Sequence, residues 1–227
     1  PQAMSAPSQP EFDAFAEDYD QALERGISVS GESKDYFAEQ RILWVKRRLD
    51  VLGFAPRRIL DFGCGTGSAA PHFRRHFPDA HLVGTDVSPR SIENARKKHA
   101  DAGSQFAVHP GYQPDKPFDL VFCNGVFHHI PLAERDSAIR YIAGVIRPGG
   151  LFAFWENNPW NPGTRIVMSR IRFDRDAITL SPPEARRLLR VGATTDKYAD
   201  PGRLSGGSSP RLVYLARIKY RHASKDH

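Results

Sequence analysis

The sequence of 227 residues predicts an α/β fold, in which helices cover a Rossmann-like, doubly wound sheet of mainly parallel strands. Three observations predict this fold. Short apolar runs are bounded by Gly, Pro, Asp or Asn, helical patterns lie between those runs, and one glycine-rich turn follows the first run. Strands that alternate with helices form parallel sheets, because each crossover helix covers one face of the sheet.

Five apolar runs have the length and the borders expected of buried parallel strands. They cover residues 57–63, 81–87, 105–110, 118–125 and 149–157. A sixth run, at 211–220, follows the loop-like residues 193–210 and predicts the last strand of the sheet.

Three helical patterns carry their own start or stop signals. Residues 86–100 have Ser88 as the expected N-cap, followed by a proline that suits the first helical position. Residues 133–150 repeat apolar side chains at helical spacing and then meet a Pro-Gly stop. Ser181 and Glu184 have the spacing of a capping box, which predicts a third helix there.

The stretch ILDFGCGTGSAA, residues 59–70, places Gly63, Gly65 and Gly67 directly after the first predicted strand. Glycines at the first strand-to-helix turn of an open α/β sheet let the backbone approach a bound nucleotide. The spacing matches neither the dinucleotide motif G-x-G-x-x-G nor a phosphate-binding P-loop. Asp86, at the end of the next strand, can accept hydrogen bonds from ribose hydroxyls. Together these residues predict a ligand that contains adenosine without a diphosphate.

Composition limits the classes of function. Lys and Arg exceed Asp and Glu by 32 to 26, but the basic residues are scattered, which makes nucleic acid an unlikely partner. Cys64 and Cys123 are too few for a disulfide framework and indicate a reducing, cytoplasmic setting. No stretch approaches the roughly 20 apolar residues of a membrane span, so no membrane partner is expected. The oligomeric state is not predicted.

Four stretches of the sequence resemble the class I S-adenosylmethionine (SAM)-dependent methyltransferases of the small-molecule type. They stand in the order found in that family: ILDFGCGTGS, VGTDVSPRSIENAR, FDLVFCNGVFHHI and VIRPGGLFAFWE. The resemblance implies a seven-stranded sheet of order 3-2-1-4-5-7-6 with the last strand antiparallel. It also implies SAM as the cofactor, with S-adenosyl-L-homocysteine as the product, and a small-molecule acceptor of the methyl group.

The resemblance implies cofactor contacts at the carboxyl ends of the strands. The three glycines would pass under the methionine part of SAM, Asp86 would hold the ribose, and the backbone near Asn124 would approach the methionine. The full predicted set is Tyr19, Asp61, Gly63, Gly65, Gly67, Asp86, Val87, His109, Gly111, Tyr112, Asn124 and Gly125.

Pro110 stands where relatives often have an acidic residue near the adenine amino group. His109, Gly111 or Tyr112 is therefore expected to line the adenine edge. Tyr19, in the N-terminal stretch FDAFAEDYD, is expected to close over the bound cofactor.

Three residues are candidates for acid–base chemistry: His128, His129 and Glu156. Methyl transfer gains mainly from alignment, which can be worth about 7–11 kcal/mol, but a hydroxyl acceptor must also lose its proton to a base. Two structural alternatives stay open. His129 can simply fix the turn after its strand, and Glu156 can anchor a loop. No set of His, Cys, Asp and Glu has metal-ligand spacing, so no metal is predicted.

The chain length fits one domain with additions. The expected segments are a disordered tail or cloning remnant at 1–10 and a single methyltransferase domain at 11–227, made of a helical lid (11–54), a SAM-binding core (55–156), an acceptor-side loop and helices (157–192) and a terminal loop and strand (193–227).

Two other functions stay open, a non-catalytic SAM-binding regulatory module and a dinucleotide-dependent oxidoreductase. Ser68 counts against the second, because the dinucleotide motif requires glycine at that position. The sequence does not specify whether oxygen, nitrogen or carbon accepts the methyl group.

Overall fold

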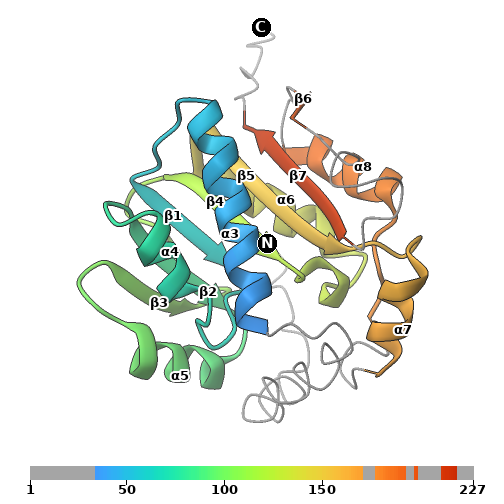
Figure 1. The fold of residues 1–227 in the computed structure, drawn as a ribbon, viewed down its shortest axis with the longest axis horizontal. Helices are drawn as coiled ribbons and strands as arrows, with labels where there is room; N and C mark the ends of the chain where they lie inside the picture. The colour runs from blue at the N-terminus through green and yellow to red at the C-terminus, as the bar shows by residue number, and fades with distance from the viewer. Residues whose placement is uncertain (1–33, 171–176, 193–196, 199–210, 219–227) are drawn as a thin grey trace, which may run out of the picture. The chain divides into compact units, whose positions relative to one another are not determined.

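The computed structural model describes residues 34–170, 177–192, 197–198 and 211–218, which are drawn in colour in Figure 1. Contacts divide the chain into two compact units. Unit 1 comprises Gly63–Gln113 and the described part of Pro1–Ala55. Unit 2 comprises Pro56–Phe62 and the described part of Pro114–His227. The domain boundaries expected from the sequence stay a prediction.

The described strands follow the predicted order. They are β1 (Arg58–Phe62), β2 (His81–Asp86), β3 (Ser104–Val108), β4 (Phe118–Asn124), β5 (Ile146–Asn157), β6 (Lys197–Tyr198) and β7 (Arg211–Arg217). The 7-stranded sheet has the order β3-β2-β1-β4-β5-β7-β6. Strand β4 runs parallel to β1 and β5, whereas β7 runs antiparallel to β5, as Figure 1 shows. The α/β class, the strand order and the antiparallel last strand are thus confirmed.

The helices of unit 1 are α3 (Lys34–Val51), α4 (Ala70–His76) and α5 (Pro89–His99). The hydroxyl of Ser88 accepts a hydrogen bond from the N–H of Ser91 at 3.1 Å, which confirms the predicted start of α5. The sequence patterns do not single out α4, because this helix of 7 residues has no side-chain N-cap. Of the predicted helical lid at 11–54, residues 11–33 lie outside the described part of the chain.

Unit 2 contains η2 (Phe127–His129), α6 (Arg135–Val145), α7 (Pro162–Arg170) and α8 (Pro182–Gly192). Helices α6 and α8 pack against each other. The hydroxyl of Ser181 accepts a hydrogen bond from the N–H of Glu184 at 3.4 Å, which confirms the predicted start of α8.

Two predicted boundaries were wrong. Strand β5 begins at Ile146 rather than at 149, because Ile146 pairs with Phe118 before the register shifts. Strand β6 lies inside residues 193–210, where a loop was expected, and it pairs antiparallel with β7. The other residues of that range lie outside the described part of the chain.

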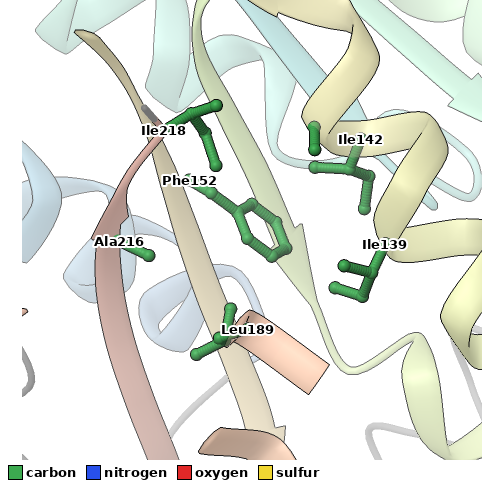
Figure 2. Close-up of a pocket in the computed structure, with 7 residues that line it drawn as sticks. Ile139, Ile142, Phe152, Leu189, Ala216 and Ile218 are labelled. Carbon is green, nitrogen blue, oxygen red and sulfur yellow. The ribbon is translucent and has the colours of Figure 1, made fainter. Parts of the chain in front are cut away.

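Unit 2 also encloses a small apolar pocket. In Figure 2, side chains from α6, β5, α8 and β7 and from the residue after β7 converge on it: Ile139, Ile142, Phe152, Leu189, Ala216 and Ile218. Its cavity volume is about 10 Å³, and its lining is apolar. Ligand sites usually exceed about 300 Å³ and carry a few polar groups. We therefore interpret this pocket as a packing gap in the core.

Membrane-spanning helices are not found among the described residues, since none of those helices combines enough length with enough apolar character. Helix α3, with 18 residues, carries charged side chains along its length.

Candidate functional site

The first candidate region is the glycine turn of unit 1. Gly63, Gly65 and Gly67 have φ values of 76°, 54° and 77°, which side chains with a Cβ rarely adopt. Among the described residues, a Cβ on Gly65 would meet no atom within 4 Å, whereas a Cβ on Gly67 would lie 3.0 Å from atoms of both Ala95 and Phe106. Gly67 therefore permits close packing on α5 and β3, and Gly65 leaves the backbone open to a neighbouring molecule.

Asp86, the last residue of β2, braces this turn. One of its carboxylate oxygens accepts a hydrogen bond from the N–H of Gly65 at 2.9 Å, and the other accepts one from the N–H of Ser88 at 2.9 Å. The carbonyl of Thr85 accepts a further bond from the N–H of Gly63 at 2.7 Å. A carboxylate can accept about four hydrogen bonds, so these two are compatible with a ligand hydroxyl.

The predicted adenine-side residues follow the carboxyl ends of β2 and β3. Val87 leaves 41% of its surface exposed directly after Asp86, an apolar surface suited to a flat ring. The backbone N–H of His109 donates to the carbonyl of Asp86 at 2.8 Å. Burial lowers the pKa of His109, which favours the neutral imidazole. Gly111 is exposed and Tyr112 is half-buried.

The second candidate region lies at the carboxyl ends of β1, β4 and β5 in unit 2. Asp61 is 5% exposed and Glu156 is fully buried. Burial raises the pKa of the Cys123 thiol well above its usual value, and the charges of Glu156 and Asp61 raise it further. Both carboxylates thus lie close enough to this buried thiol to affect it.

Asn124 ends β4, and Gly125 begins the turn that follows. The side-chain oxygen of Asn124 is buried and has no hydrogen-bond partner within the described ranges. A buried acceptor of this kind calls for a donor, which a bound molecule can supply. The N–H of Gly125 donates to the carbonyl of Trp155 at 2.8 Å. A Cβ on Gly125 would lie 3.6 Å from the ring of His128, so glycine allows the ring to lie near the backbone.

Glu156, near the end of β5, holds the turn after β4. One carboxylate oxygen accepts hydrogen bonds from the N–H of Val126 at 2.9 Å and the N–H of Phe127 at 2.7 Å. The other oxygen lies 2.7 Å from Nδ1 of His128. Through these three contacts the Glu156 side chain anchors η2 and the residue before it.

The two adjacent histidines differ in their partners. His128 is 5% exposed and forms a pair with the carboxylate of Glu156. When Nδ1 of His128 donates to that carboxylate, Nε2 becomes the basic nitrogen of the imidazole. His129 is half-buried, and its backbone N–H donates to the carbonyl of Val126 at 3.0 Å. The two rings lie with their centres 4.0 Å apart.

Tyr19 lies outside the described residues. Arg135 was missed, although it is a buried arginine that bonds to three segments of unit 2. A basic residue in the first turn of a helix opposes the helix dipole. The position of Arg135 at the start of a predicted helix was therefore the sequence signal that could have singled it out. In the ranges that the structure describes, His, Cys, Asp and Glu side chains form no group of three suited to a metal ion.

Residues 60–152 match a protein family described as a methyltransferase domain. The trans-aconitate 2-methyltransferase of Methylobacterium nodulans is 30% identical over 178 residues, which are 76% of this chain and 64% of that relative. The corresponding protein of Rhodopseudomonas palustris is 24% identical over 172 residues and is covered over 62% of its length. This chain therefore spans less than two thirds of the length of these curated relatives.

Solved methyltransferase structures share the fold. Magnesium protoporphyrin IX methyltransferase from Synechocystis, with bound S-adenosylhomocysteine, has a TM-score of 0.64 at 20% identity over 91% of this chain and 97% of that chain. Human N-acetylserotonin methyltransferase, in complex with SAM, has a TM-score of 0.66 at 17% identity over 95% of this chain and 61% of that chain.

Proposed function

We propose that this chain carries a class I SAM-dependent methyltransferase domain and that it transfers the methyl group of SAM to a small-molecule acceptor. When bound, SAM supplies a methyl group on a sulfonium, whose C–S bond breaks toward sulfur as the acceptor attacks and leaves S-adenosylhomocysteine. The scattered basic residues and the two cysteines support a small-molecule acceptor and a cytoplasmic setting rather than a nucleic-acid partner.

Each unit, taken by itself, has residues whose chemistry suits a part of SAM. Among the described residues no atom lies near a Cβ built on Gly65, and Asp86, which holds the same turn, is the proposed acceptor for a ribose hydroxyl. In unit 2, the buried oxygen of Asn124 is an acceptor suited to the ammonium group of the methionine part. The buried carboxylate of Asp61 favours a cationic ligand. We propose Val87 and the segment around His109 as the adenine side.

One observation carries the chemical part of the proposal, the buried pair of His128 and Glu156 at 2.7 Å. The carboxylate orients the imidazole and stabilises its protonated form, so that Nε2 can take a proton from the acceptor. His128 is therefore the proposed general base, and Glu156 is the residue that positions it. His129 is proposed to shape the turn through its backbone.

The pair favours an acceptor that must lose a proton. A carboxylate is already ionised at neutral pH, whereas a hydroxyl needs a base as its oxygen forms the bond to carbon. Large apolar side chains on the segments after β4 and β5 are exposed, which favours an acceptor with an apolar body: Leu132, Trp160, Ile166 and Ile178. We propose an apolar or aromatic hydroxyl compound as the acceptor class.

An acceptor screen with radiolabelled SAM tests this proposal. The panel contains aromatic hydroxyl compounds, primary amines and trans-aconitate, the compound in the name of the relatives. We expect labelled product with a hydroxyl compound and much less with His128→Gln. Binding of SAM without product from any acceptor would instead favour a regulatory SAM-binding module. Preferred labelling of trans-aconitate would contradict the proposed acceptor class.

A further inference from the structure

Arg135 is a fully buried cation at an unusual place, the first residue of α6. Its side chain is 1% exposed. A positive charge at a helix N-terminus opposes the helix dipole, and burial of a guanidinium is costly unless its N–H groups find acceptors. A residue that only begins a helix would gain nothing to offset these two free-energy costs. The contacts of Arg135 therefore deserve an explanation beyond helix formation.

The guanidinium joins three segments of unit 2. Its Nε donates to the carbonyl of Ile130 at 3.0 Å, just after η2. One Nη donates to the carboxylate of Glu184, in the first turn of α8, at 3.0 Å. The other Nη donates to the carbonyl of Ile178, in the segment that leads into α8. Only a guanidinium offers donors in this forked arrangement, because the ammonium of lysine is a single point.

Ile178 connects this cluster to the histidine. Its carbonyl accepts from Arg135, and its N–H donates to the carbonyl of His128 at 3.0 Å. The turn that carries His128 is therefore held from two sides. Glu156 holds it from the sheet, and Arg135 holds it through Ile178.

We propose that Arg135 is a positioning residue that fixes the segment 177–181 against η2 and thereby sets the orientation of His128 toward the acceptor. This inference rests on the proposed function of His128. Arg135 itself does not touch the acceptor, and its effect passes through the peptide group of Ile178.

The central variant is Arg135→Lys, with Arg187→Lys as the matched control. Arg187 also links α8 to α6, through Asp136 at 3.2 Å, but its side chain is 56% exposed. We expect Arg135→Lys to lower kcat about tenfold to a hundredfold, because small misplacements of reacting groups have effects of that size. The affinity for SAM should stay within twofold, and Arg187→Lys should leave both quantities unchanged.

A spectroscopic measurement adds a test that requires no acceptor. Imidazole ¹H–¹⁵N correlation spectra of the full chain report which nitrogen of His128 carries the proton, with His128→Gln used for assignment. We expect a single Nδ1–H form in the wild type and in Arg187→Lys, and a mixture of both forms in Arg135→Lys. A role in stability alone would not change the proton position in a folded variant.

A second variant keeps the inference testable when Arg135→Lys fails to fold. Glu184→Gln retains an acceptor for Arg135 but removes the ion pair, and we expect about a threefold lower kcat and a shifted His128 signal. Unchanged kcat and unchanged His128 spectra in both folded variants would overturn the inference, and so would an equal loss of SAM affinity and kcat. When the wild type transfers no methyl group at all, the proposed function fails, and the His128 spectra alone decide about Arg135.

Discussion

The turn after β1 is shaped by backbone, whereas the turn after β4 is held by buried charged side chains. In unit 1, glycines with positive φ leave a bare backbone, and Asp86 braces it at 2.9 Å. In unit 2, Glu156, His128 and Arg135 form the contacts, and each side chain is at most 5% exposed. A turn built from backbone suits the binding of a cofactor, which is the same in every reaction cycle. A turn held by ionisable groups suits chemistry that moves a proton.

The largest expected effect separates binding from chemistry in unit 2. His128→Gln retains a donor for Glu156 but has no basic nitrogen, so we expect kcat to fall by about 10²–10⁴-fold with a hydroxyl acceptor. SAM affinity, measured by calorimetry, should change less than twofold. His129→Ala is the companion variant. A larger loss of kcat in His129→Ala than in His128→Gln would contradict the assignment of His128 as the base.

The second test compares two glycines of the same turn. Gly67→Ala adds a Cβ that lies 3.0 Å from Ala95 and Phe106, whereas Gly65→Ala adds one that meets no atom of the described residues within 4 Å. We expect a loss in the free energy of unfolding of about 2–5 kcal/mol for Gly67→Ala and about 1–2 kcal/mol for Gly65→Ala. Urea unfolding gives both values. Equal losses would show that packing of the turn on α5 contributes nothing.

Asp86→Ala should weaken SAM binding at least tenfold, or about 1.4 kcal/mol, because a carboxylate acceptor is lost from the ribose and from the turn. Asp101→Ala is the matched control, since Asp101 also accepts a backbone N–H, from Gly103 at 2.7 Å, but lies on an exposed turn. Calorimetry on both variants makes the comparison. Equal SAM affinity in Asp86→Ala and the wild type would refute the ribose assignment.

The smallest expected effect concerns pH. The pKa of His109 is lowered from 6.5 by burial, so the unfolded chain binds this proton more readily, and stability falls as pH drops below 6.5. The pKa of Cys123 is raised above 9.0, so stability falls as pH rises past 9.0. Each slope is at most about 1.4 kcal/mol per pH unit. We measure the free energy of unfolding as a function of pH. Its dependence on pH should become weaker at acid pH in His109→Gln and at alkaline pH in Cys123→Ala. An unchanged pH dependence in these variants would contradict the assignments.

Local rules predicted the features of unit 1 well. The N-cap at Ser88 and the glycine turn depend on residues that are neighbours in sequence, so their geometry follows from local conformational preferences. The bond between the Asp86 carboxylate and the N–H of Gly65 depends on the spacing of β2 from the turn and could not be predicted from the sequence pattern.

In unit 2, local rules did not predict the contacts between residues that are far apart in sequence. His128 and Glu156 were each predicted as candidates, but their pairing depends on how β4 and β5 align, and the two residues are separated by 28 positions. Arg135 and Glu184 are 49 positions apart and lie on different helices. Long-range contacts of this kind depend on tertiary packing, which no local pattern contains. The start of β5 is a further example, because the pairing of Ile146 with Phe118 extends this strand beyond its predicted start.

The most direct test is the rate of radiolabelled methyl transfer at saturating SAM for the wild type and Glu156→Gln, with a hydroxyl acceptor. Gln at this position is nearly the same size, but it provides no charge to orient and stabilise the imidazole of His128. We expect product with the wild type and a rate at least about a hundredfold lower in the variant, at equal SAM affinity. Equal rates, or no product from either protein, would contradict this expectation.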